Sequence, residues 1–526
     1  MRRLAAAFVV GCCAVLGASV PAAGAERPAL TPGAADALTR ALENGRLTEA
    51  GYALARARSL FAIDNVRKEF GRVATPSPRD ATALLRDLAA RANLLRGKDR
   101  ARAAAILARP AADDFACDAG RSLCFHWRTS GRHATSPSDV NKTVNTFSAV
   151  WDLQVGAYGY LAPLPDSNGV GPETDIYLRD LGGNKVSLFG YCTTDDPDAT
   201  LSNPFADVSA YCVVDNDFAE FGTSQSPDAF RDVTAAHEFF HAIQFAYDWR
   251  EDLWLMEGTA MLMEGQFRPG VDDRILYLGN SVLTFPRTPV DLGADGFEYG
   301  AWIYWRFLVE DFGELDDPLI IRRIWERAAG ASVDTDGPGP DTVAENPYSI
   351  IATRKAITNR GGSFRPLFAK FAQVNRVPAK FYDEGASYPR APVGSTRTIS
   401  PGETTGWRST TLHHLANAYY SFVPAAGMGG GATLRLFVDL PQLRLGPAAG
   451  VVIVFDDGSI DRRQISLDAS GRGSRTVPFG HGTVKRVDLV LSNSSSRMDC
   501  NRGTPYSCAG VGLDDLRSYD YRARAG

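Results

Sequence analysis

A predicted helix of the chain contains the pentapeptide His237-Glu238-Phe239-Phe240-His241. Residues four apart lie on one face of an α-helix, so both imidazoles can reach one metal ion. Glu238 lies one step round the helix, where its carboxylate can contact a water on the metal without being a ligand. Residues 231–247 contain no Pro or Gly, and their apolar residues recur with helical spacing. The sequence therefore predicts a metal site on this helix, with an acidic side chain beside it.

A third metal ligand is expected on the next helix. A catalytic zinc ion takes three protein ligands and keeps a fourth position for water. Glu257 follows His241 by 16 residues, which leaves room for one helix to end and a second to begin beside it. Gly258 and Ala260 are small and would let the two helices approach closely. Glu264 is the alternative ligand, although a Glu at such a position is more often a solvated helix residue.

The combination of HExxH with Trp254-Leu255-Met256-Glu257-Gly258-Thr259-Ala260 resembles the gluzincin metallopeptidases, whose motif is WLxEGxA. The resemblance implies one catalytic Zn²⁺ held by His237, His241 and Glu257. It also implies that Glu238 is the general base that takes a proton from water as the water attacks a peptide bond. On this reading the partner of the protein is a protein or peptide substrate.

The wider segment from Cys124 to Tyr388 also resembles a family of secreted bacterial metalloproteases first recognised in myxobacteria. This resemblance implies a zincin-like fold, with a small mixed sheet, an active-site helix and a helical lower half. Gluzincins often stabilise the oxyanion with a Tyr or His from a later helix. Phe297 holds the usual register position here, so the adjacent Tyr299 is the candidate catalytic donor, with a packing role as its alternative. Met261 stands where some members have an Asp that orients a His, so that carboxylate is not identified.

The N-terminus has the layout of a secretory signal peptide, residues 1–25. A basic start is followed by the apolar run Leu4 to Val20 and by the cleavage sequence Ala23-Gly24-Ala25. The run is short and rich in Ala and Gly, which disfavours a transmembrane anchor. Val9-Val10-Gly11-Cys12 is similar to a lipobox, so lipoprotein anchoring is a minor alternative. The protein is expected to be secreted, with no membrane span.

Six cysteines remain after the predicted signal peptide, and they form three local pairs. An even number of cysteines in an exported chain indicates disulfides. Close spacing favours the pairs Cys117/Cys124, Cys192/Cys212 and Cys500/Cys508. Cys192 is expected in a Gly- and Asp-rich loop that its disulfide would fix to the sheet.

The chain is predicted to be α+β with three parts after the signal. Residues 26–112 form a helical N-terminal segment, and the sequence leaves open whether it is a propeptide or a permanent subdomain. Residues 113–395 form the zincin-like metallopeptidase domain. Residues 396–526 contain short alternating runs separated by Gly and Ser turns, which predict a β-sandwich accessory domain.

Composition excludes some functions. With 56 Lys and Arg against 61 Asp and Glu, the net charge is −5, and no basic stripe of a nucleic-acid-binding protein is present. We expect a monomeric zinc metallopeptidase. The alternative from a different class is a catalytically inactive, zincin-shaped binding or adhesion protein, which would have no need of stoichiometric zinc.

Overall fold

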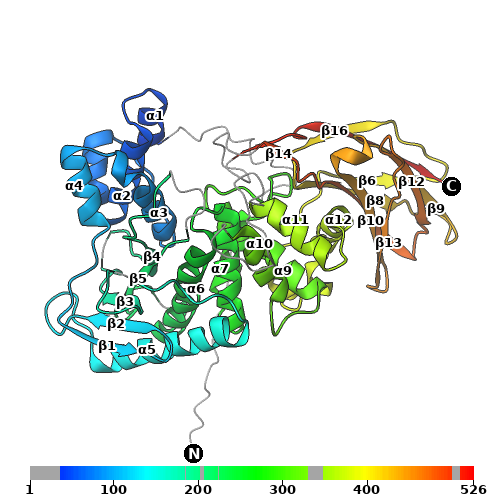
Figure 1. Cartoon of the computed structure of the whole chain (residues 1–526). Coiled ribbons are helices and arrows are strands. Elements are labelled where there is room, and N and C mark those ends of the chain that lie inside the picture. The colour runs from blue at the N-terminus through cyan, green and yellow to red at the C-terminus, as the bar shows by residue number, and fades with distance from the viewer. Residues whose placement is uncertain are drawn as a thin grey trace, which may run out of the picture.

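The computed structural model describes residues 36–166, 168–183, 185–201, 207–222, 224–329, 348–499 and 510–526. The predicted signal peptide and the predicted Cys500/Cys508 pair lie outside these residues. In the described part the protein is α+β, with helices α1–α4 at one end and a sheet-rich C-terminal region at the other (Figure 1). No helix in this part is both long enough and apolar enough to cross a membrane.

In the described residues, helices and five strands occupy the chain up to Val374, and the remaining strands follow from Ser395. The helices are α1 Ala37–Glu43, α2 Glu49–Phe70, α3 Ala81–Arg91, α4 Gly97–Ile106, α5 Pro137–Trp151, α6 Pro227–Asp248, α7 Leu253–Phe267, α8 Phe297–Gly300, α9 Trp302–Asp311, α10 Leu319–Ala328, α11 Ser349–Asn359 and α12 Phe364–Val374. The strands are β1 Asp114–Asp118, β2 Leu123–Trp127, β3 Thr174–Arg179, β4 Gly190–Thr193, β5 Tyr211–Asp215, β6 Ser395–Ile399, β7 Arg408–Leu412, β8 Ala416–Pro424, β9 Thr433–Asp439, β10 Pro447–Phe455, β11 Ile460–Gln464, β12 Arg472–Pro478, β13 Val484–Asn493, β14 Met498–Asp499, β15 Val511–Gly512 and β16 Arg517–Ala525.

The N-terminal half is built on a mixed sheet with the strand order β1-β2-β3-β5-β4. Strands β2, β3 and β5 are parallel, and the outer strands β1 and β4 run antiparallel to their neighbours. Side chains alternate between the two faces of a strand. Ile176 and Leu178 of β3 therefore pack toward the core that contains α5 and α6, whereas Tyr177 packs against the core formed with α1–α4.

Two predicted disulfides are confirmed, and one expectation about their setting was wrong. Cys117 bonds to Cys124 and Cys192 bonds to Cys212. Cys192 does not lie in a loop: it belongs to strand β4, directly opposite Cys212 of β5. The short run of β4 carried no alternating pattern, so its pairing with β5 was not visible in the sequence.

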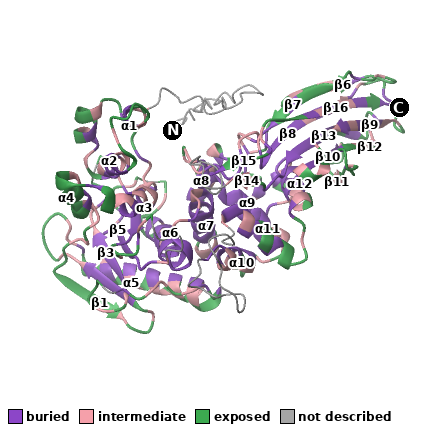
Figure 2. Ribbon diagram, turned by 45° about the horizontal axis from the view of Figure 1, so that its top comes forward, coloured by how far each residue is buried: buried purple, intermediate pink, exposed green. Residues whose placement is uncertain are grey.

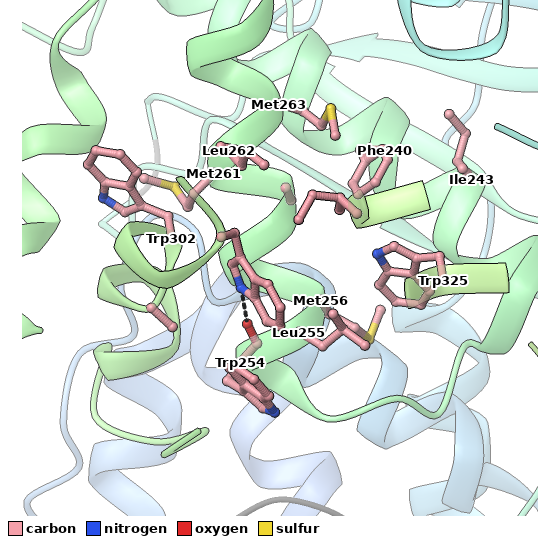
Figure 3. Packing of buried hydrophobic residues seen from close by; sticks show 14 of the residues in the cluster. Phe240, Ile243, Trp254, Leu255, Met256, Met261, Leu262, Met263, Trp302 and Trp325 are labelled. Carbon is pink, nitrogen blue, oxygen red and sulfur yellow. Dashed lines mark hydrogen bonds between the residues drawn. The ribbon is translucent and has the colours of Figure 1, made fainter. Parts of the chain in front are cut away.

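A tightly packed aromatic core places α6 and α7 side by side. Phe240 and Ile243 of α6, Trp254 and the methionines of α7, Trp302 of α9 and Trp325 of α10 belong to one buried cluster (Figure 3). Gly258 of α7 packs against α9, because a Cβ at that position would lie 2.5 Å from the indole nitrogen of Trp305. The expectation that Gly258 lets α7 approach α6 was therefore wrong, since the close contact at this glycine is with α9.

The C-terminal region is a β-sandwich. Its two sheets have the strand orders β11-β10-β13-β8-β6 and β12-β9-β16-β7, and they share one apolar core. The first strand begins at Ser395, slightly before the predicted boundary. Helix α12 packs on β10 and β13, where buried Arg376 pairs with Asp488. Figure 2 shows that exposed residues are concentrated on α1 and α4 and along the sandwich edges, while α6, α7 and α9 are buried.

A buried ion triad connects the sandwich to the helical half. His414 lies between Asp515 (Nδ1 to Oδ1, 2.6 Å) and Asp291 (Nε2 to Oδ1, 3.1 Å). Burial alone would lower the pKa of His414, but the two carboxylates raise it from 6.5 to about 10. A group with a raised folded-state pKa stabilises the fold fully below its unfolded pKa, and this contribution is lost as pH rises through the folded value.

His414→Gln is therefore expected to lower the free energy of unfolding at neutral pH by about 3 kcal/mol, because Asp291 loses a buried cation. The difference in stability between wild type and variant should shrink as pH rises from 6.5 toward 10. Urea unfolding at several pH values measures this difference. A difference that stays constant over the whole range would show that His414 is not charged in the folded protein.

Candidate metal centre

The metal-site motif lies in the middle of a long buried helix. Ser226 caps the start of α6 by accepting the backbone N–H of Ala229, and Pro227 occupies the first turn, where its missing N–H costs nothing. His237 and His241 are four residues apart and both are fully buried, with exposed fractions of 0%. Helix periodicity alone thus directs the two rings toward α7.

The three predicted ligands converge. Nε2 of His237 lies 3.3 Å from Oε2 of Glu257, and Nε2 of His241 lies 3.4 Å from the same oxygen. Metal–ligand bonds of about 2.0–2.2 Å in a tetrahedron place neighbouring ligand atoms about 3.3–3.6 Å apart. His237, His241 and Glu257 therefore form a group that could hold a metal ion.

Unpaired atoms and charge in the group also fit a cation. His241 Nε2 and Glu257 Oε1 are buried without a hydrogen-bond partner, which is costly unless something else is bound there. Burial would raise the pKa of Glu257, but the neighbouring His241 and His237 lower it to about 2, so the carboxylate is ionised. An ionised carboxylate and two imidazoles are the donor set that zinc accepts.

Each histidine is oriented through its second ring nitrogen. Nδ1 of His237 lies 2.8 Å from Oε1 of Glu264, and Nδ1 of His241 lies 2.7 Å from Oε1 of Gln244. These acceptors fix the proton on Nδ1 and leave Nε2 free for a metal. Glu264 is only 1% exposed, so the expectation that it is a solvated helix residue was wrong.

Glu264 is thus the orienting carboxylate that could not be identified from the sequence. It lies seven residues after Glu257, two helical turns along the same face of α7, so the signal was its spacing. As a ligand, Glu264 is disfavoured, because it bonds to the Nδ1 side of His237 while Glu257 lies on the Nε2 side.

Glu238 lies beside the group under the edge strand β4. Burial raises its pKa, which brings the carboxyl group nearer to the range useful for a base. Oε2 of Glu238 accepts a hydrogen bond of 3.1 Å from the hydroxyl of Thr82 on α3. Gly190 of β4 permits the close passage of the strand, since a Cβ there would lie 3.1 Å from Cγ of Glu238.

Tyr299 of α8 also lies close to the group. Its hydroxyl donates a hydrogen bond of 3.2 Å to Oδ1 of Asp80. Burial, with the nearby charges of Glu257 and Asp80, raises the pKa of Tyr299 well above its usual value, so it is a proton donor at all relevant pH values.

One further acidic residue was missed by sequence reasoning. Glu298 precedes Tyr299 and has a buried, unpaired Oε2. Burial, together with the charges of Asp80 and Glu257, raises its pKa to about 8. No spacing rule marked this residue, because its position depends on how α8 packs against α7.

Glu264→Gln is expected to weaken metal binding about 10- to 100-fold while the ligands stay in place, because the Nδ1 proton of His237 loses a charged acceptor. Competition with a chromophoric chelator measures the affinity. Glu43→Gln, on the exposed surface of α1, is the matched control and should bind metal like the wild type. Equal affinities in the two variants would remove Glu264 from this role.

Comparisons with known proteins add no functional assignment. No family model matches the chain, and no curated protein matches it. Among solved structures, PliG of Aeromonas hydrophila, a periplasmic inhibitor of g-type lysozyme, is 8% identical over 25% of this chain and 98% of its own, with a TM-score of 0.15. The 4-O-methyl-alpha-glucuronidase BtGH115A is 8% identical over 70% of this chain and 53% of its own, with a TM-score of 0.14. A beta-glucosidase of Paenibacillus barengoltzii gives a TM-score of 0.13 at 9% identity, over 74% and 49% of the two chains.

Proposed function

We propose that the protein is a secreted zinc-dependent peptidase. The observation that carries the proposal is the convergence of two Nε2 atoms and one carboxylate oxygen at 3.3 and 3.4 Å, with a buried Glu238 next to them. The two disulfides in the described residues support an oxidising, extracytoplasmic environment.

His237, His241 and Glu257 would hold the ion, and three protein ligands leave one position for water. Zinc supplies a Lewis acid that lowers the pKa of a bound water toward about 7. The hydrogen bonds from His237 to Glu264 and from His241 to Gln244 keep both rings aligned for this task.

Glu238 is the proposed general base. Its carboxylate would accept a proton from the attacking water and deliver it to the nitrogen of the leaving amine. The raised pKa of Glu238 suits the first transfer, since a carboxylate of low pKa would accept the proton of water poorly. Tyr299 would donate its hydroxyl proton in a hydrogen bond to the oxyanion that forms during the attack.

The alternative, an inactive binding protein of the same shape, is favoured by one observation. The start of helix α3 covers the site. Thr82 is hydrogen-bonded to Glu238, and Asp80 is hydrogen-bonded to Tyr299. Zinc stoichiometry and the release of peptides from casein, measured after the N-terminal helices have been removed, test the proposal. One zinc per chain with hydrolysis supports it, whereas a chain without zinc or hydrolysis supports the alternative.

A further inference from the structure

The candidate metal centre is closed in this structure. The exposed fractions of His237, His241 and Glu257 are 0%, 0% and 1%. A peptide could not reach these groups as they lie. The cover comes from far away in the sequence, from the start of α3 and the residues just before it.

Thr82, in the first turn of α3, bridges the edge of the sheet and the proposed base. Its hydroxyl accepts the backbone N–H of Cys192 at 2.9 Å and donates to Oε2 of Glu238 at 3.1 Å. Cys192 belongs to strand β4, which is the edge of this sheet among the described residues. An edge of this kind binds extended chains by backbone hydrogen bonds. Thr82 thus forms hydrogen bonds both to a backbone N–H of the edge strand and to the carboxylate of Glu238, the proposed base.

Asp80 occupies the second functional position. Its Oδ1 accepts a hydrogen bond from the hydroxyl of Tyr299, the proposed oxyanion donor. Its Oδ2 accepts a hydrogen bond of 2.7 Å from the backbone N–H of Ser77. The two residues of the chain that would contact the reacting peptide, Glu238 and Tyr299, are therefore both bonded to the same short segment of α3.

Arg79 anchors this segment. Its guanidinium is buried and pairs with Glu264 and, at 2.8 Å, with Asp273. Its Nε also donates to the hydroxyl of Tyr277 at 3.0 Å. Further along α3, Arg86 donates to the backbone oxygens of Trp249 and Glu251, in the turn that joins α6 to α7. The contact thus reaches from the orienting carboxylate to the turn between the two ligand helices.

We propose that helices α1–α4 are an intramolecular inhibitor, which keeps the protein latent by placing Asp80 and Thr82 where a substrate would bind. This inference rests on the proposed peptidase function, because it assigns to α1–α4 the regulation of the candidate metal centre. Of the two alternatives left by the sequence, it favours a removable segment. A structural subdomain alone would account for the apolar contact with the sheet but not for hydrogen bonds to the base and the oxyanion donor.

The position of the cut follows from the contacts of the linker. Arg109 pairs with Asp166, Asp175 and Asp195, so the chain is fixed up to that residue. Residues 111–113 are exposed and lie just before strand β1. Exposed backbone is where proteases cut, so cleavage is expected at 111–113.

The test uses the full chain with a specific protease site inserted between Ala112 and Asp113. The first readout is modification of His237 and His241 by diethyl pyrocarbonate in metal-free protein, measured by mass spectrometry. The second is hydrolysis of a fluorogenic peptide in the presence of zinc. Each is measured before and after the cut, in the wild type and in Asp80→Ala/Thr82→Ala. Arg102→Ala on the exposed face of α4 is the matched control.

We expect the rate of modification of the two histidines to rise at least about tenfold when the cut is combined with Asp80→Ala/Thr82→Ala. A tenfold change corresponds to a free-energy difference of about 1.4 kcal/mol. Arg102→Ala should behave like the wild type. If modification of His237 and His241 is unchanged in the cut double variant, α1–α4 do not act as an inhibitor. Faster modification without peptide hydrolysis would support the cover and count against the proposed peptidase, so the two failures are distinguishable.

Discussion

Glu238→Gln is expected to retain zinc and to lose about 10²- to 10⁴-fold in kcat, because the amide keeps the shape of the carboxylate but accepts no proton. Glu238 is not among the three converging ligands, so the substitution should leave metal affinity almost unchanged. The amide can still accept the hydrogen bond from Thr82, which preserves the local packing.

The measurement is kcat for a fluorogenic peptide with zinc content determined on the same sample, after release of α1–α4. Asp316→Asn is the matched control, since Asp316 is an exposed acid that remains in the chain after α1–α4 are released. Peptide hydrolysis at the wild-type rate in zinc-loaded Glu238→Gln would exclude Glu238 as the base.

Glu257→Ala is expected to cause the largest loss of metal affinity among single acidic substitutions. Structural zinc sites bind with about 10–16 kcal/mol, so one of about four ligands contributes roughly 3 kcal/mol, or more than about a hundredfold. The substitution also leaves Nε2 of His237 and of His241 without the carboxylate that lies 3.3 and 3.4 Å away.

The comparison with Glu264→Gln makes this prediction specific. Both acids are buried on α7 and both contact His237, so a general effect of lost charge would weaken binding equally. A ligand and an orienting residue differ, and Glu257→Ala should lose clearly more affinity in the chelator competition. The reverse order would mean that Glu264 is the ligand and that the assignment from the motif was wrong.

The grouping of His237, His241 and Glu257 could be predicted because it depends on local spacing. Two histidines four apart on one helix, and a Glu on the next helix beside a small residue, come together once α6 and α7 pack. Gly258 specifies a different contact, that of α7 with α9, where a side chain at this position would collide with Trp305. The disulfide pairs were predictable for the same reason, since each joins neighbouring strands that are close in sequence.

The cover of the site could not be predicted, because it depends on contacts between distant parts of the chain. Thr82 and Glu238 are 156 residues apart, and Asp80 and Tyr299 are 219 apart. No sequence pattern in α3 indicates which of its side chains will contact residues of α6 or α8. Strand β4 was missed for a similar reason: it is short, lies among Gly and Asp residues, and is defined by its pairing with β5.

The role of Glu264 could be predicted only in part. Its spacing from Glu257 placed it on the correct helix face, but the sequence could not show whether that face meets solvent or His237. The packing of α7 against α6 decides this, and it turns a residue of a type that is usually solvated into a buried partner of the site.

We propose that His237, His241 and Glu257 hold one zinc ion. Diffraction data collected on both sides of the zinc absorption edge, from crystals of the full chain grown with zinc, test this most directly. One anomalous peak is expected within about 2.0–2.2 Å of His237 Nε2, His241 Nε2 and a Glu257 oxygen. Absence of a peak at these three atoms, or a peak coordinated by Glu264 in place of Glu257, would contradict it.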